Sequence, residues 1–126
     1  MATGVLIAES IPPPASLDAV PMTVHKLERV TPGNISPEQL AAGIPPDWTL
    51  LHVEIPDEDA PRLADQLAEV LGEFGWYADL QAAGETFVIY TGRVFRYPRG
   101  DAAGRAEAVE YGRAHGVPDA QLDWPY

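Results

Sequence analysis

The chain has 126 residues, of which 46% are hydrophobic and 21% charged, values typical of one globular domain with its own core rather than of a disordered chain. It contains no cysteine, which excludes disulfides, thiolate metal ligands and cysteine nucleophiles. The formal net charge of −11 disfavours nucleic acid and anionic membranes as partners, because like charges repel.

The beginning of the sequence lacks the marks of an export signal. Residues 1–5 contain neither a basic segment nor the start of a long apolar one, and nowhere do about 18 apolar residues follow one another. We therefore expect a cytoplasmic protein.

Residues 1–47 are expected to form an N-terminal extension rich in β structure. β-Branched and aliphatic residues favour strands at residues 5–11 and 22–30. A short helix should follow Ser36, because its hydroxyl can cap a helix and Gln39 stands at the capping-box position.

Residues 48–126 are expected to form the α+β core, beginning with a strand at residues 49–55, where apolar and polar residues alternate. The spacing of the next apolar residues predicts a helix that is capped by Asp59 and ended by Gly75. Its apolar stripe consists of Leu63, Leu67, Val70, Leu71 and Phe74.

A three-strand meander is predicted at residues 76–81, 86–91 and 93–97, with Gly92 in the last turn. In the register set by this turn, one face carries Val88, Tyr90, Arg93, Phe95 and Tyr97, and the other carries Phe87, Ile89, Val94 and Arg96. Both faces are apolar enough to need cover. Asp101 then caps a second helix that extends to about residue 115.

The order of elements indicates an α+β fold with a single domain over residues 1–126. We expect an antiparallel sheet with two helices on one face. The architecture that this order favours is a ferredoxin-like two-layer sandwich with a β-rich N-terminal extension, and a looser α/β sandwich is the alternative.

Candidate catalytic residues are His52 and Glu54, which share one strand face, and Asp79, which the meander could bring to them. A carboxylate beside an imidazole can orient a general base. The stronger interpretation is a half-exposed strand face with ordinary polar residues. The three histidines lack metal-ligand spacing, so we expect no metal and no cofactor.

A second group of residues could line a pocket for an anionic or aromatic small molecule. These ligand-binding candidates are Trp76, Tyr77, Tyr90, Arg93, Phe95, Arg96, Tyr97 and Arg105. Aromatic residues in strands more often fill the core, because they occupy large volumes on a pleated surface.

Asp65, Glu69 and Glu73 recur at helical spacing and are candidate partner-binding residues. Acids concentrate in residues 54–85 and arginines in residues 93–113. This separation would suit a symmetric homodimer or another protein partner, although a solvated helix face explains the stripe as well.

Three segments, WYADL (residues 76–80), GRVFRY (92–97) and GVPDAQLDW (116–124), resemble a small family of actinobacterial proteins without an assigned activity. The resemblance covers the chain from about residue 5 onward. It implies a bacterial cytoplasmic protein, as does the arginine-rich composition with Lys26 as the single lysine.

The leading functional hypothesis from sequence is a non-catalytic protein-interaction module, because the charges are separated and no catalytic motif stands out. One alternative is a small-molecule-binding protein or small enzyme that uses the aromatic and arginine-bearing sheet face. Another is an acidic inhibitor or immunity-type protein that mimics nucleic acid. Salt-sensitive binding that requires the acidic helix would distinguish this last alternative.

Overall fold

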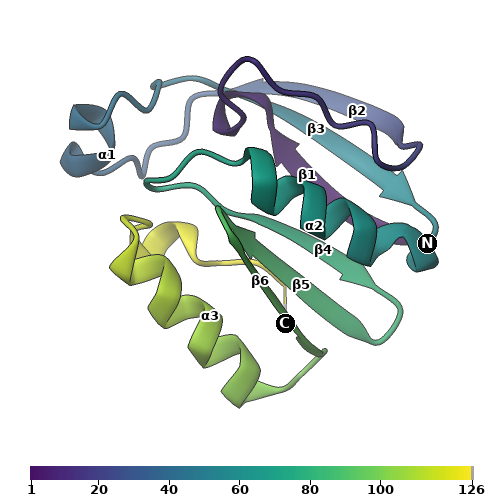
Figure 1. Ribbon diagram of the computed structural model, residues 1–126. Helices are drawn as coiled ribbons and strands as arrows, with labels where there is room; N and C mark the ends of the chain where they lie inside the picture. Colours follow the sequence, from purple (N-terminus) through teal and green to yellow (C-terminus); the bar gives the residue numbers. More distant parts are fainter. Residues whose placement is uncertain (126) are drawn as a thin grey trace.

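The computed structural model describes residues 1–125 and contains one antiparallel sheet of six strands with three α-helices packed around it (Figure 1). The strand order is β2-β3-β1-β4-β5-β6. The strands are β1 (Ala2–Ile7), β2 (Thr23–Val30), β3 (Trp48–Ile55), β4 (Ala78–Ala82), β5 (Glu85–Tyr90) and β6 (Arg93–Pro98). The helices are α1 (Pro37–Ala41), α2 (Ala60–Val70) and α3 (Ala102–Ala114). The predicted α+β class is confirmed.

Strand β1 lies inside the sheet. It pairs antiparallel with β3 on one side and with β4 on the other, so β3 and β4 run in the same direction and are joined by α2. Because β2 also pairs with β3, the first residues are part of the sheet. Residues 1–47 contain strands and a short helix, as predicted, but their role as an extension outside the core is not confirmed. Local strand patterns reveal a strand but not which distant strand it pairs with.

The two longer helices lie on opposite faces of β5. The observed pairing of β5 with β6, including Tyr90 opposite Arg93, is the predicted register, and successive side chains of a strand point to opposite faces. Phe87 and Ile89 join the core under α2, whereas Val88 and Tyr90 join a second core under α3. The prediction of two helices on one face, and with it the ferredoxin-like two-layer sandwich, is wrong, because β5 is apolar on both faces.

Helix α2 ends at Val70, before the predicted end of the stripe. Leu71 takes an extended conformation, and the N–H of Gly72 donates to the carbonyl of Ser10 at 2.7 Å. Leu63, Leu67 and Leu71 are buried as predicted. Phe74 is instead 40% exposed and lies over Gly116, where a Cβ atom would come within 2.3 Å of its ring.

The helix starts follow local sequence signals closely. Ser36 and Gln39 form the reciprocal capping box of α1, and the Asp101 carboxylate accepts hydrogen bonds from the N–H groups of Ala103 and Gly104 at the start of α3. Asp59 precedes α2 without such a bond.

None of the helices in residues 1–125 is long and apolar enough to cross a membrane.

Helix α3 covers only about half of the sheet face on which it packs. Residues from α3 and the segment after it pack on β5 and β6 and form the second core: Val88, Tyr90, Phe95, Tyr97, Ala108, Val117, Leu122 and Trp124. Side chains of β1 and β3 that point to this same face of the sheet remain accessible to solvent. Thr3 is exposed, and Val5 and His52 are half-buried. A hollow forms where the cover ends.

Candidate functional site

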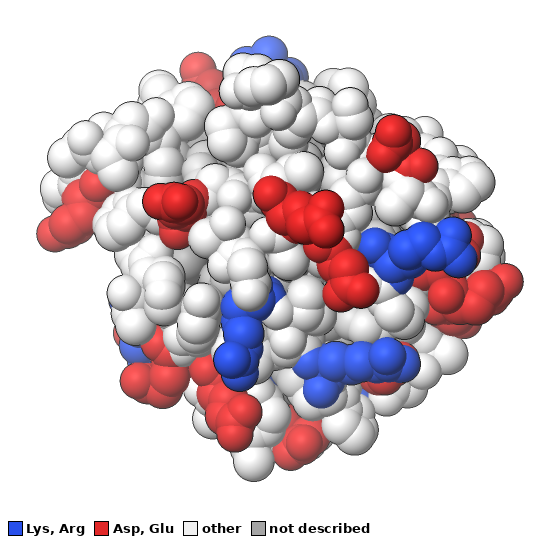
Figure 2. Space-filling model, viewed as in Figure 1, with Lys and Arg blue, Asp and Glu red and all other residues white. Residues whose placement is uncertain are grey.

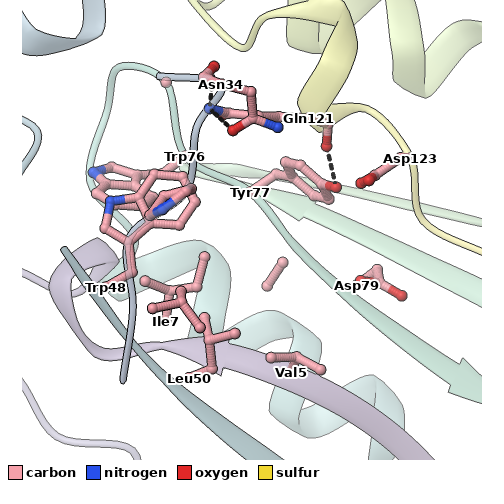
Figure 3. Close-up of a pocket in the computed structure, with 14 residues that line it drawn as sticks. Val5, Ile7, Asn34, Trp48, Leu50, Trp76, Tyr77, Asp79, Gln121 and Asp123 are labelled. Atoms are coloured by element: carbon pink, nitrogen blue, oxygen red, sulfur yellow. Dashed lines mark hydrogen bonds between the residues drawn. The ribbon is translucent and has the colours of Figure 1, made fainter. Parts of the chain in front are cut away.

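The hollow has a volume of about 280 Å³ and lies on the accessible half of the sheet (Figure 3). This volume is close to the lower end of the range for small-molecule pockets. Its lining comes from four strands and from the loops beside them: Val5, Ile7, Val30, Pro32, Asn34, Trp48, Leu50, Gly75, Trp76, Tyr77, Ala78, Asp79, Gln121 and Asp123.

The floor of the hollow is aliphatic. Val5 and Ile7 alternate along β1 with Leu6, which is buried in the core on the α2 side, so a single strand supplies both core and floor. Leu50 of β3 lies opposite Ile7 in the pairing register, and Val30 at the end of β2 completes the floor.

Two tryptophans close one end of the hollow. The Trp48 and Trp76 ring centroids are 5.1 Å apart, and the rings are tilted at 53°. The Trp48 indole N–H donates to the carbonyl of Pro45 at 2.9 Å, which fixes this ring. Together with Ile44 the tryptophans form a small separate core, so this end of the hollow is rigidly packed.

The opposite end is polar and anionic, with Asp79 of β4 and Asp123 of the C-terminal segment on the side of Tyr77 away from the tryptophans (Figure 3). Burial raises the pKa of the Asp79 carboxyl, a hydrogen bond from Gln81 at 2.9 Å lowers it, and the charge of Asp123 raises it further. Burial, followed by the charges of both carboxylates, also raises the pKa of Tyr77. The Tyr77 hydroxyl therefore keeps its proton, which it donates to the Gln121 carbonyl.

Buried amides hold the upper wall of the hollow in place. The Gln39 side-chain N–H₂ donates to the carbonyl of Gly75 at 3.1 Å and to the side-chain oxygen of Gln121 at 2.9 Å. Gln121 in turn donates to the backbone carbonyl of Asn34 at 3.1 Å. No buried side-chain N or O atom within residues 1–125 is left without a hydrogen-bond partner, so this wall needs no ligand to satisfy its polar groups.

The three candidate catalytic residues do not form one group. His52 bonds to Glu28 of β2, with 2.7 Å between Nε2 and Oε1, and Glu54 lies 3.8 Å from His25. The hydrogen bond from His52 is the largest cause that lowers the pKa of Glu28. Strand β1 separates β3 from β4, which puts about 10 Å between the backbones that carry His52 and Asp79. Of the three candidates, only Asp79 lines the hollow.

The aromatic ligand-binding candidates divide into two groups. Trp76 and Tyr77 line the hollow. Tyr90, Phe95 and Tyr97 are buried under α3 and the C-terminal segment. These three rings belong to the core, which is the interpretation that the sequence favoured over an open pocket.

The arginine candidates lie outside the hollow. Arg93 lies over the ring of Phe95 at 4.5 Å, and Arg96 forms a bidentate ion pair with Glu85, with both distances 2.8 Å. Arg93 and Arg96 lie on opposite faces of β6, because they are three positions apart along a strand. Arg105 of α3 lies over the ring of Trp124 at 4.8 Å.

The candidate partner-binding residues are accessible. Asp65 and Glu69 are exposed on α2, and Glu73 is exposed beyond the end of this helix. Figure 2 shows acidic and basic side chains interspersed over the face that carries α2. The separation of charges along the sequence therefore does not become a separation in space on this face.

Sequence reasoning did not identify most of the lining. Val5, Ile7 and Leu50 appeared only as strand residues, and Gln121 and Asp123 were part of the resembling segment without a role.

No cluster of three or more histidine, aspartate or glutamate residues is placed to hold a metal ion in residues 1–125. Comparisons with protein-family models, curated proteins and solved structures found no match.

Proposed function

We propose that this chain is a binding protein for a small organic molecule, which it holds in the hollow between β1, β3, β4 and the C-terminal segment. The observation that carries the proposal is the combination of an aliphatic floor, two tryptophans and a few convergent polar groups in one concave site. Ligand pockets have this composition: mostly apolar walls and a small number of polar groups that fix orientation.

The rigidity of the walls supports the proposal. Trp48 is fixed by its bond to Pro45, and the amides of Gln39 and Gln121 tie the C-terminal segment to α1. A site that exists before the ligand arrives avoids the entropic cost of ordering its side chains on binding. Small molecules can therefore gain affinity here despite the modest volume.

A matched pair of variants tests this proposal. Val5→Phe places a ring in the hollow, while Thr3→Phe places the same ring on the same face of β1, outside the lining. Neutral and charged single-ring fragments would be screened by saturation-transfer NMR, and the affinities of the hits measured by calorimetry. We expect Val5→Phe to weaken the hits at least tenfold, about 1.4 kcal/mol, because it fills the space they occupy.

The control variant decides what such a loss means. Thr3→Phe should bind the hits as the unmodified chain does. Equal loss of affinity in both variants would mean that the substitutions disturb β1 in general. If Val5→Phe weakened none of the hits, or the screen gave no hits, the proposal would be refuted.

Protein contact through β2 is a second candidate function. This strand is an edge of the sheet, and Val24 and Leu27 on it are 51% and 61% exposed. In an antiparallel pairing with a second copy centred on Leu27, Lys26 would lie opposite Glu28, a favourable cross-strand pair. The bulge between Val24 and Lys26 is a feature that discourages edge pairing, which places this function second.

A further inference from the structure

The hollow is polarised along its length, which restricts the chemistry of a ligand. Figure 3 shows Trp48 and Trp76 at one end and Asp79 and Asp123 at the other, with Val5 and its aliphatic neighbours along the floor. A molecule that occupies the whole hollow must be apolar at one end and polar at the other, because unmatched polar groups are costly when they lose water.

The side chains at the polar end offer hydrogen-bond acceptors. Ionised carboxylates of Asp79 and Asp123 can only accept. The Tyr77 hydroxyl donates a hydrogen bond to the Gln121 carbonyl, so its oxygen can still accept a hydrogen bond. A ligand group that meets these three side chains must donate hydrogen bonds, and a positively charged donor forms the stronger, charge-assisted kind.

The electrostatics of the polar end also favour a cation. Burial and the negative charge of Asp123 both oppose ionisation of Asp79. The positive charge of Arg105 favours ionisation, but its effect on the pKa of Asp79 is smaller than that of Asp123. Asp123 is exposed and Asp79 is half-buried, and the two negative charges repel each other. A ligand cation between them would relieve this repulsion.

We propose that the ligand is an organic cation that carries a primary ammonium group on a small aromatic or aliphatic body, an inference that rests on the proposed function of the hollow. The body lies on the floor formed by Val5, Ile7 and Leu50 and meets the tryptophans. The ammonium group donates hydrogen bonds to Asp79 and Asp123. A volume of about 280 Å³ suits a single ring with a short side chain.

Three probes of similar size separate the effect of charge from the effect of shape. 2-Phenylethylamine, 2-phenylethanol and phenylacetate share one ring and a short chain but are cationic, neutral and anionic at neutral pH. In calorimetric titrations we expect the amine to bind at least tenfold more tightly than the alcohol, and phenylacetate to bind most weakly, because the polar end is anionic.

Charge variants locate the source of this preference. The double variant Asp79→Asn/Asp123→Asn should bring the affinities of the amine and the alcohol to within about twofold of each other. The matched control is Asp65→Asn/Glu69→Gln, which removes the same charge from α2 on the other face of the sheet and should preserve the tenfold preference. Retention of the amine preference by the first variant would overturn the inference.

The outcomes for the inference and for the proposed function are distinct. Equal binding of the amine and the alcohol, abolished by Val5→Phe, would refute the cationic ligand and leave the hollow as a binding site. Fragment hits in the hollow with no binding of 2-phenylethylamine would have the same meaning. If Val5→Phe weakened no fragment in the screen, both proposals would fail.

Discussion

Asp79 lies in an environment that is unfavourable to its ionised carboxylate. It lies on β4 between Tyr77 and Gln81, and the hydroxyl of Thr86 bonds to Gln81 at 2.9 Å, so that Gln81 in turn donates to the carboxylate. Burial is the largest of the effects on its pKa, which is raised above the ordinary value of 3.8. Residues that cost stability in this way are frequent at binding sites.

Asp79→Asn should stabilise the unliganded protein at neutral pH. Because the folded-state pKa of Asp79 is raised, the ionised carboxyl costs stability above that pKa, and the cost disappears as the pH falls toward 3.8. Each kcal/mol recovered should raise Tm by about 3–5 °C in a domain of this size. Calorimetric scans between neutral pH and pH 4 would measure the difference in Tm between the variant and the unmodified chain.

The pH dependence of this difference is the informative quantity. The difference should be positive at neutral pH and shrink as the solution is acidified. The control Asp65→Asn removes one charge from an exposed position of α2 and corrects for the change in net charge. A lower Tm for Asp79→Asn than for this control at neutral pH would contradict the account of Asp79.

Among the elements, those defined by local signals could be predicted from the sequence. The Thr91-Gly92 turn set the register of β5 with β6, and Asp101 marked the start of α3, because turn and cap residues act on their immediate neighbours. The place of β1 between β3 and β4 could not be predicted in this way. Its partners lie far along the chain, and the pattern of a strand does not name its neighbours.

The exposed edge at β2 yields a prediction at the same scale. If β2 pairs with a second copy, the unmodified chain should sediment as a concentration-dependent dimer, and Leu27→Lys should weaken that dimer at least tenfold because like charges would meet at its centre. Analytical ultracentrifugation measures both. Leu40→Lys, a change at another exposed leucine on α1, is the control and should leave the dimer intact. Monomers at every concentration would remove this candidate function.

The molecule as a whole covers its sheet unequally. One face packs against α2, with Ile11, Leu17, Ala19 and Met22 from the loop before β2 adding to that core. On the other face, α3 and the C-terminal segment cover β5 and β6, and the hollow lies beside this cover. Both faces of β5 could be recognised from sequence as needing cover. The sequence does not show how much of this face α3 and the C-terminal segment cover, because that depends on the paths of β1 and of the C-terminal segment.

The full set of residues that line the candidate site could not be predicted from the sequence, for the same reason. Trp76, Tyr77 and Asp79 could be selected from the sequence because aromatic and acidic residues stand out near a predicted strand. Val5 and Asp123 could not, since their roles exist only once β1 and the C-terminal segment meet beside β4. Aromatic residues of β5 and β6 are buried under α3, in line with the favoured interpretation of strand aromatics as core and not with the alternative of an arginine-lined pocket.

The most direct test is two-dimensional NMR of the indole N–H groups of ¹⁵N-labelled protein during titration with 2-phenylethylamine. Trp48 and Trp76 line the hollow, and so does Val5. We expect the Trp48 and Trp76 signals to shift together and saturate in the unmodified chain and to stay in place in Val5→Phe. Unmoved Trp48 and Trp76 signals in the unmodified chain, or equal shifts in Val5→Phe, would contradict a ligand site in the hollow.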